Sequence, residues 1–205
     1  PRMFDFAQAH PEIELRFTAT LRSLDFDRDR IDVAVRYSTR EEPDLHGVDL
    51  GSDATLPVMR PDVAASAPDL DTLARLPLLA DASLDFLDPA PDWATWFRAA
   101  GGPVPPSPAA AFSQADHALD AALAGGGAVL ARSSLARPLL AAGRLVAPFP
   151  VALGVPARFR FLCRKGEEDR PAIAALRGWL TTQMTGGDDP LSGMRVVPVS
   201  EVPAS

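Results

Sequence analysis

The clearest pattern of apolar and polar positions lies in residues 109–144, where short apolar runs alternate with segments of helical period. The apolar runs, at residues 109–112 and 128–131, have the length of strands. The Ser-x-x-Asp spacing that begins at Ser113 is that of a capping box, which predicts a helix starting there. Three glycines at 125–127 can end this helix. The pattern therefore predicts a strand–helix–strand unit followed by a second helix.

The rest of the chain adds elements of both types. Strands are expected at residues 13–17, 31–37, 77–80 and 157–163, with a longer extended segment at 48–59. Helices are expected at residues 1–10, 93–100 and 171–184, with helical pieces between 61 and 76. Asp92 and Asp169 are expected to cap the helices that follow them. Residues 145–156 contain several prolines and are expected to be irregular.

Composition narrows the class of protein. With 205 residues, of which 47% are hydrophobic, the chain can bury a core in one large domain or two small lobes. Its net charge is −7, and the 20 Lys and Arg residues are dispersed, so nucleic-acid binding by this chain is not expected. A single cysteine, Cys163, excludes an internal disulfide and suits a reducing compartment. No signal peptide or membrane-spanning run is evident, so we expect a cytoplasmic protein without membrane association.

No catalytic or metal motif stands out. His10, His46 and His117 are far apart and form no metal-binding spacing. Ser133 and Ser134 follow an apolar run but lack the G-x-S-x-G surroundings of a hydrolase nucleophile, and helix capping explains them better. The glycines at 125–127 do not match a dinucleotide-binding motif. We therefore expect no cofactor, no metal and no enzyme activity.

Several segments together carry a family resemblance. They are HPEIELRF, RDRIDVAVRYS, PDLHGVDLGSDATLPVMRPDVA, PDWATWFRAAGG, FSQADHALDAALAGGGAVLARSSLARPLLAAGRLVAPF and DRPAIAALRGWL, in this order. In order and spacing the chain resembles the effector-binding (substrate-binding) domain of LysR-type transcriptional regulators, and within it the glycine-cleavage-activator-like subgroup. The resemblance covers nearly all of residues 1–184.

The resemblance implies an α/β fold with two Rossmann-like lobes of the type 2 periplasmic-binding-protein kind, joined by two crossing strands. A small effector would lie in the cleft between the lobes. Lobe 1 would comprise residues 1–56 and 158–184, and lobe 2 residues 57–157. Residues 185–205 would form a linker and an extended tail.

The chain also departs from the family pattern. The N-terminal helix-turn-helix, the linker helix and the first strand of lobe 1 have no counterpart in this sequence. DNA binding is therefore expected only through a domain that this sequence does not contain. Residues 194–200 offer two readings: a strand that takes the place of the missing first strand, as in a circular permutation, or the tail of a trimmed fragment. Pro198 counts against the first reading, because proline removes a hydrogen bond from a central strand.

The resemblance implies candidate effector-binding residues at the helix start after residue 112 and at the ends of the lobe 1 strands. A helix that begins directly after a strand presents free amides and a positive dipole end, which favours anions. The candidates are Ser113, Gln114, Thr18, Thr20, Tyr37, Ser38 and Arg36. Each has a plain structural alternative: helix capping for Ser113, strand and turn chemistry for the threonines, and an ordinary surface position for Arg36.

The leading hypothesis is a sensor module. A small, anionic metabolite would bind between the lobes and shift the populations of lobe and dimer arrangements, which an attached DNA-binding domain would convert into transcriptional control. The family resemblance implies a homodimer that pairs the first helix with a helix near residues 134–142 of the partner. The alternative is a stand-alone solute-binding protein of the same fold.

Overall fold

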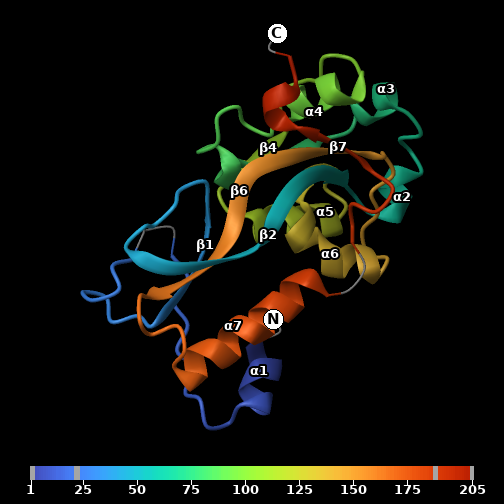
Figure 1. The fold of residues 1–205 in the computed structure, drawn as a ribbon. Coiled ribbons are helices and arrows are strands. Elements are labelled where there is room, and N and C mark those ends of the chain that lie inside the picture. The colour runs from blue at the N-terminus through green and yellow to red at the C-terminus, as the bar shows by residue number, and fades with distance from the viewer. Residues whose placement is uncertain (1–2, 21–23, 187–188, 204–205) are drawn as a thin grey trace. The chain divides into compact units, whose positions relative to one another are not determined.

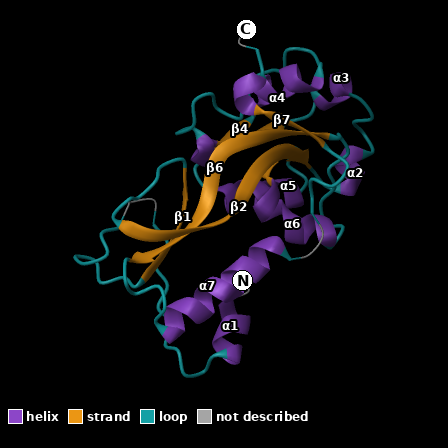
Figure 2. Ribbon diagram, viewed as in Figure 1, coloured by secondary structure: helices purple, strands orange, loops and turns teal. Residues whose placement is uncertain are grey.

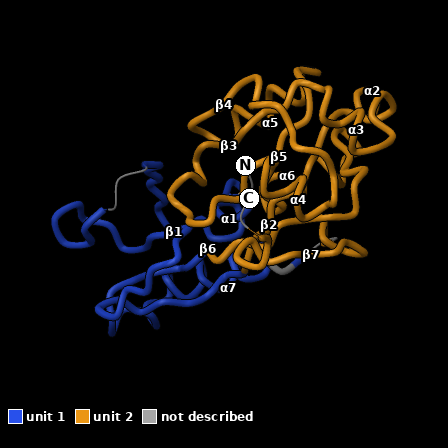
Figure 3. The backbone as a smooth tube through the Cα atoms, turned by 90° about the horizontal axis from the view of Figure 1, so that it is seen from above, with its two compact units in different colours: residues 1–51, 158–187 blue, residues 52–157, 188–205 orange. Residues whose placement is uncertain are grey.

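The computed structural model describes residues 3–20, 24–186 and 189–203. Their contacts divide the chain into two compact units, which Figure 3 shows in different colours. Unit 1 comprises Pro1–Gly51 and Arg158–Gly187, and unit 2 comprises Ser52–Ala157 and Asp188–Ser205. Two long strands contribute residues to both units.

Helices and strands alternate along the chain (Figure 1). The helices are α1 (Met3–Ala9), α2 (Pro61–Ala64), α3 (Leu70–Leu73), α4 (Trp93–Ala100), α5 (Ala115–Leu123), α6 (Ser133–Ala141) and α7 (Pro171–Thr185). The strands are β1 (Val33–Ser38), β2 (Leu45–Val58), β3 (Leu78–Asp81), β4 (Ala110–Phe112), β5 (Ala128–Arg132), β6 (Val151–Arg164) and β7 (Arg195–Pro198). Short 3-10 turns follow β3 (Ala82–Leu84, η1) and β7 (Val199–Glu201, η2).

Unit 1 is built on the antiparallel pair of β1 and β6, with Val33 opposite Cys163 and Ser38 opposite Arg158. One face of this pair is apolar and packs against α7, which is drawn in Figure 2 as the long helix beside these strands. The buried residues of this hydrophobic cluster, which also includes a residue of β2, are Leu50, Phe161, Cys163 and Ile173. The α1 residue Phe6 is fully buried and its ring lies 5.5 Å from that of Trp179 on α7. The helices predicted from the amphipathic patterns of residues 1–10 and 171–184 are thus confirmed as α1 and α7, while residues 1 and 2 lie outside the described part of the chain.

Unit 2 holds the parallel part of the sheet. β3 lies between β4 and β5 and is parallel to both, whereas β2 pairs with β5 in the antiparallel direction. Successive residues of β5 belong to two different hydrophobic clusters, Val129 to one and Leu130 to the other, so this strand is buried on both faces. That is why residues 128–131 form an unbroken apolar run.

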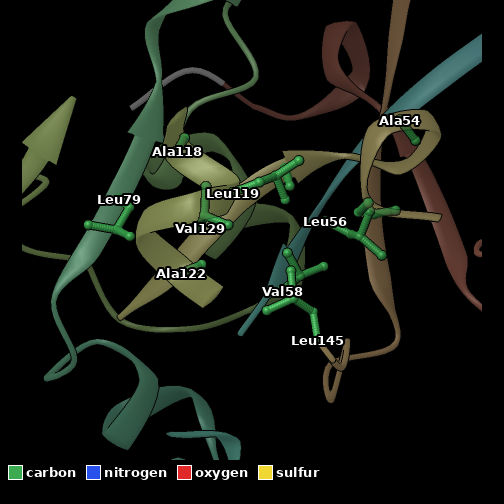
Figure 4. Packing of buried hydrophobic residues seen from close by; sticks show 12 residues of the cluster. Ala54, Leu56, Val58, Leu79, Ala118, Leu119, Ala122, Val129 and Leu145 are labelled. Atoms are coloured by element: carbon green, nitrogen blue, oxygen red, sulfur yellow. The ribbon is translucent and has the colours of Figure 1, made fainter. Parts of the chain in front are cut away.

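The two hydrophobic clusters of unit 2 hold its helices in place. The first packs α5 and α6 against β2, β3 and β5 (Figure 4). The second packs α4, whose indoles also donate hydrogen bonds: Trp93 Nε1 to the carbonyl of Leu79 at 2.9 Å and Trp96 Nε1 to that of Val151 at 3.0 Å. As predicted, Asp92 caps α4 by accepting a hydrogen bond from the Thr95 amide at 2.7 Å.

Four local predictions are wrong. Residues 13–17 do not form a strand: Phe17 is 64% exposed, and an alternating pattern becomes a strand only where a neighbouring strand takes up its backbone groups. Residues 151–156, expected to be irregular, belong to β6, because β7 and buried contacts support them. The capping box at Ser113 is absent, since α5 begins two residues later. Asp169 does not cap α7, whose N-cap position is Arg170.

Part of the tail forms the strand β7. β7 pairs in parallel with the unit 2 end of β6, with Arg195 opposite Val151 and Pro198 opposite Gly154. It therefore does not replace a first strand of lobe 1, and the circular-permutation hypothesis is wrong. Residues 189–203 are also more than an extended tail, since Leu191 and Met194 pack against the first cluster of unit 2.

Candidate functional site

The carboxyl ends of the parallel strands in unit 2 bring several polar residues together. β3, β4 and β5 end at Asp81, Phe112 and Arg132, and Asp81 lies directly opposite Phe112. Ser113 and Gln114 follow β4 immediately and lead into α5. Open α/β sheets bind ligands at this edge, so it is the first place to look for a site.

Ser113 and Gln114 are exposed at the start of α5. Gln114 occupies the N-cap position, but its side chain makes no capping hydrogen bond. Among the described residues, neither side chain has a hydrogen-bond partner. Because the first amides of a helix also lack intrahelical partners, this corner presents donors to solvent and favours a negatively charged group.

Next to this corner lies a buried ion pair. The Asp81 and Arg132 side chains are 2% and 13% exposed, and Asp81 Oδ2 lies 3.5 Å from Arg132 Nε. Arg132 Nη2 also donates to Ser83 Oγ at 3.3 Å, while Asp81 Oδ1 accepts from the Ser83 amide at 3.0 Å. Arg132 is therefore committed to internal contacts and is poorly placed to receive a ligand.

A second buried carboxylate, Asp53 of β2, fixes the start of α6. Asp53 Oδ1 accepts hydrogen bonds from Ser133 Oγ at 2.6 Å and from the Ser134 amide at 3.1 Å, and Oδ2 accepts from Ser134 Oγ at 2.5 Å. Asp53 is 3% exposed and Ser133 5%. The two serines thus have a structural role at a helix N-terminus, where negative charge is favourable, rather than a catalytic one.

Two hollows lie in unit 2, one small and one open to solvent. One, lined by Asp81, Leu84 and Trp93 among others, has a volume of about 40 Å³. It has room for about one to three water molecules and none for a metabolite. The other is an open depression lined by Arg60 and Leu123, at the end of α5 away from Ser113. Neither qualifies as an effector pocket by itself.

The candidates in unit 1 separate onto two faces of β1. Arg36 forms an ion pair with Glu42 and donates to the Leu24 carbonyl at 2.6 Å. Ser38 Oγ accepts a hydrogen bond from the Arg40 amide at 2.9 Å. Tyr37 points to the opposite face, where its ring lies 4.6 Å from that of Phe159. The strand therefore brings Arg36 and Ser38 together and separates them from Tyr37.

Thr18 and Thr20 are exposed and lie in an irregular segment, next to residues 13–17, where a strand was predicted. The strand end that was expected to position both threonines is not formed.

Sequence reasoning missed two arginines on β6. Arg158 lies opposite Ser38 and Arg160 opposite Arg36, so both share a face with these candidates. The alternation of arginine and phenylalanine in residues 158–161 was the available signal for their common face. The pairing register, which the sequence does not contain, decides which β1 residues they accompany.

The ion pair between Asp49 and Arg158 on this face lowers the pKa of the Asp49 carboxyl. Partial burial acts to raise the pKa of the Asp49 carboxyl, but hydrogen bonds from Arg158 and the Gly51 amide outweigh it and hold that pKa below its ordinary value. Asp49 is therefore charged at neutral pH and neutralises Arg158.

Comparison with known proteins identifies the family. The family model described as LysR substrate binding domain matches residues 1–185. The chain belongs to this family. It is 33% identical over 191 residues to the glycine cleavage system transcriptional activator of Escherichia coli K12, an alignment covering 88% of this chain and 58% of that protein. It is 29% identical over 186 residues to the HTH-type transcriptional activator AmpR of Rhodobacter capsulatus, covering 89% and 61%.

Solved structures agree with the sequence matches. The effector domain of AmpR of Pseudomonas aeruginosa superposes with a TM-score of 0.69 at 26% identity, covering 90% of this chain and 87% of that one. The AmpR effector-binding domain of Citrobacter freundii gives a TM-score of 0.70 at 24% identity, covering 90% of both chains. The predicted fold class is thus confirmed: this is the α/β, periplasmic-binding-protein-like fold of LysR-type effector-binding domains.

These matches bear on function as well. The named relatives are transcriptional regulators, not enzymes, and they do not favour the alternative of a stand-alone solute-binding protein. The chain spans about 60% of the length of these two curated relatives. Among the described residues, no helix is long and apolar enough to cross a membrane, and no group of His, Cys, Asp and Glu side chains could hold a metal ion.

Proposed function

We propose that this chain is the effector-sensing part of a LysR-type transcriptional regulator. A small anionic metabolite binds it and controls transcription through a DNA-binding domain outside this sequence. The observation that carries the proposal is the corner at Ser113 and Gln114, where two exposed side chains precede the amides of α5 and make no hydrogen bond to any residue that the structure describes. Such a corner suits a carboxylate or phosphate, which accepts hydrogen bonds from amides, hydroxyls and carboxamide N–H groups.

Residues of unit 1 complete the proposed site, in the cleft between lobes that the family resemblance implies. Ser38 and Arg36 are the strongest candidates because they share one face of β1. Thr18, Thr20 and Tyr37 also belong to the proposed set. A ligand held by residues of both lobes would bind one lobe arrangement better than another, which is the requirement for shifting their populations.

The regulator is proposed to act as a homodimer in the cytoplasm, where its DNA target lies. The helices that the family resemblance assigns to the dimer contact are α1 and α6, and each exposes a large apolar side chain: Phe4 is 67% exposed and Leu135 37%. Such exposure suits an interface between copies. Light scattering at micromolar concentration should give twice the mass of the chain, whereas a monomer would contradict this part of the proposal.

A thermal-shift screen of small carboxylates, amino acids and phosphorylated metabolites tests the sensing role. An effector at about 100 times its dissociation constant should stabilise the protein by about 2.7 kcal/mol. The double variant Ser113→Ala, Gln114→Ala should weaken its binding at least tenfold, because both side-chain contacts are lost.

The matched control is Ser107→Ala, an exposed serine in the loop before β4. It should leave the effector's affinity unchanged. Equal affinity of the wild-type protein and the double variant for a ligand that stabilises them would contradict the role proposed for α5.

A further inference from the structure

The polar face of the β1–β6 pair in unit 1 carries a group of arginines. Residues directly opposite each other in an antiparallel pair point to the same face. Arg36 lies opposite Arg160 and Ser38 opposite Arg158, and alternate residues of each strand share a face, so all four side chains stand together. The other face, with Phe159, Phe161 and Cys163, packs against α7.

Two of these arginines have carboxylate partners and one does not. Arg36 pairs with Glu42, and Arg158 pairs with Asp49. For Arg160 the structure shows a hydrogen bond from Nη1 to the Arg40 carbonyl at 3.4 Å, and no carboxylate of the described residues lies within ion-pair distance of it. Three guanidinium groups thus share this face with two paired carboxylates.

The placement of Arg160 opposite Arg36 is unfavourable without a counter-charge. Like charges directly opposite on paired strands are destabilising. The chain as a whole is acidic, with a net charge of −7, so a local excess of positive charge runs against its general composition. Glu42 pairs with Arg36, and Asp49 interacts electrostatically with Arg160, so a bound anion would reduce the repulsion beyond what these two carboxylates do.

Gly47 of β2 gives the Arg160 side chain its position. A Cβ atom at residue 47 would lie 3.0 Å from Arg160 Nη2 and 3.2 Å from Leu162 Cδ2. The guanidinium therefore lies across the backbone of β2, over a residue without a side chain. This keeps it close to the strand and near the Asp49–Arg158 pair, and the charge of Arg160 helps to lower the pKa of Asp49.

We propose that Arg160, assisted by Arg158 and Ser38, binds an anionic group, carboxylate or phosphate, of the ligand. The planar guanidinium can donate two parallel hydrogen bonds to either group. The inference rests on the proposed function insofar as Ser38 belongs to both sets of residues, and it adds that the effector must carry a full negative charge at the end that meets unit 1. An uncharged analogue would leave Arg160 without a carboxylate or phosphate at ion-pair distance, whereas Arg36 would keep its pair with Glu42.

Inorganic phosphate and succinate are suitable probes, measured by calorimetry and thermal shift at constant ionic strength against chloride. The wild-type protein should bind at least one of them saturably, and which one binds tells phosphate chemistry from carboxylate chemistry. Arg160→Gln should weaken that binding at least tenfold. Arg75→Gln, which removes an exposed arginine from unit 2, should leave it unchanged.

Gly47→Ala provides a second variant that keeps every charge. The new methyl group displaces the guanidinium, so it should also weaken binding of the probe severalfold. If Arg160 had only a structural role, Arg160→Gln would lower the melting temperature while leaving the ligand-induced shift intact. That result, or the lack of any saturable binding in the wild-type protein, would overturn the inference. The Ser113 and Gln114 test can succeed independently, so the two failures are distinguishable.

Discussion

At the scale of single residues, several buried polar side chains of this protein pair with groups far away in the sequence. Asp53 is the clearest case, since one carboxylate satisfies two hydroxyls and a backbone amide at the start of α6. No motif in the sequence indicates this contact, because its partners lie 80 and 81 positions away. Such pairings are set by the fold and not by local spacing.

Replacing Asp53 with alanine should destabilise unit 2. The substitution removes four hydrogen bonds to one buried carboxylate, from the Ser133 and Ser134 hydroxyls and from the Ala54 and Ser134 amides. It also leaves the buried Ser133 hydroxyl unpaired, and together these losses should cost about 2–4 kcal/mol. Urea unfolding would measure the loss. Asp62→Ala is the matched control, because Asp62 pairs with Arg60 at the exposed surface and should contribute less than about 1 kcal/mol. Equal losses for the two variants would contradict the role assigned to Asp53.

Cys163 should be chemically silent in the folded protein. Its side chain is fully buried, and burial, followed by the nearby charge of Glu168, raises the pKa of the thiol. The thiolate is the reactive form, so alkylation at pH 8 should be much slower than for a free cysteine and should reach the normal rate only in denaturant. Rapid labelling of the native protein would show that β6 opens readily.

The Asp49–Arg158 pair should make the polar face of unit 1 sensitive to acid. Because the pKa of Asp49 is lower in the folded chain than in the unfolded chain, the pair contributes stability above the unfolded value, and this contribution is lost as pH falls through the folded value. Unfolding measured between pH 6 and pH 3 should show a smaller pH dependence for Asp49→Asn than for the wild type. An unchanged dependence would mean that the exposed pair is screened by solvent.

At the scale of elements, replacing a glycine with alanine should stabilise the protein at one position and destabilise it at another. Gly178 lies inside α7, where an added Cβ would meet nothing within 4 Å. Gly178→Ala should therefore raise stability by about 0.5–1 kcal/mol, seen as a higher melting temperature. Gly127 has a φ of +136° and an added Cβ would lie 2.0 Å from the Pro77 carbonyl oxygen, so Gly127→Ala should be severely destabilising. A neutral Gly178→Ala would indicate that α7 is strained where it passes this residue.

The elements show where sequence patterns suffice. The periodicities of α1, α4, α5 and α7 and the apolar run of β5 predicted those elements. Each of these helices buries one apolar face, and β5 is buried on both faces, so the burial is visible in the pattern of the segment itself. Residues 13–17 have an equally good alternation and form no strand, since a strand also needs a partner. The start of β6 was missed for the converse reason: β7, more than 40 residues later, supports it.

The candidate site was predictable only in outline. The location of Ser113 and Gln114 follows from the order of strand and helix, and the structure leaves both side chains exposed. For Tyr37 the strand position was foreseen but not the face. Arg158 and Arg160 could not be assigned to the site from the sequence because their relation to Ser38 and Arg36 depends on the register of two strands about 120 residues apart.

At the scale of the whole molecule, two of the covalent connections between the units lie within the strands β2 and β6. Both contribute residues to unit 1 and to unit 2. Gly51 of β2, with a φ of +133°, is the last residue of unit 1 before the chain enters unit 2. Two residues later, Asp53 accepts a hydrogen bond from Ser134 at the start of α6. The helix proposed for the dimer contact is α6. A displacement of β2 next to Gly51 would therefore reach this helix through Asp53.

The position of β7 matters for anyone who shortens the protein. β7 covers one side of residues 151–154 by parallel pairing. Without residues 195–203, the amides and carbonyls of that stretch would lose their neighbour and become an open template for strands of other molecules. Loss of these few residues should thus cause self-association into insoluble polymers before it affects ligand recognition.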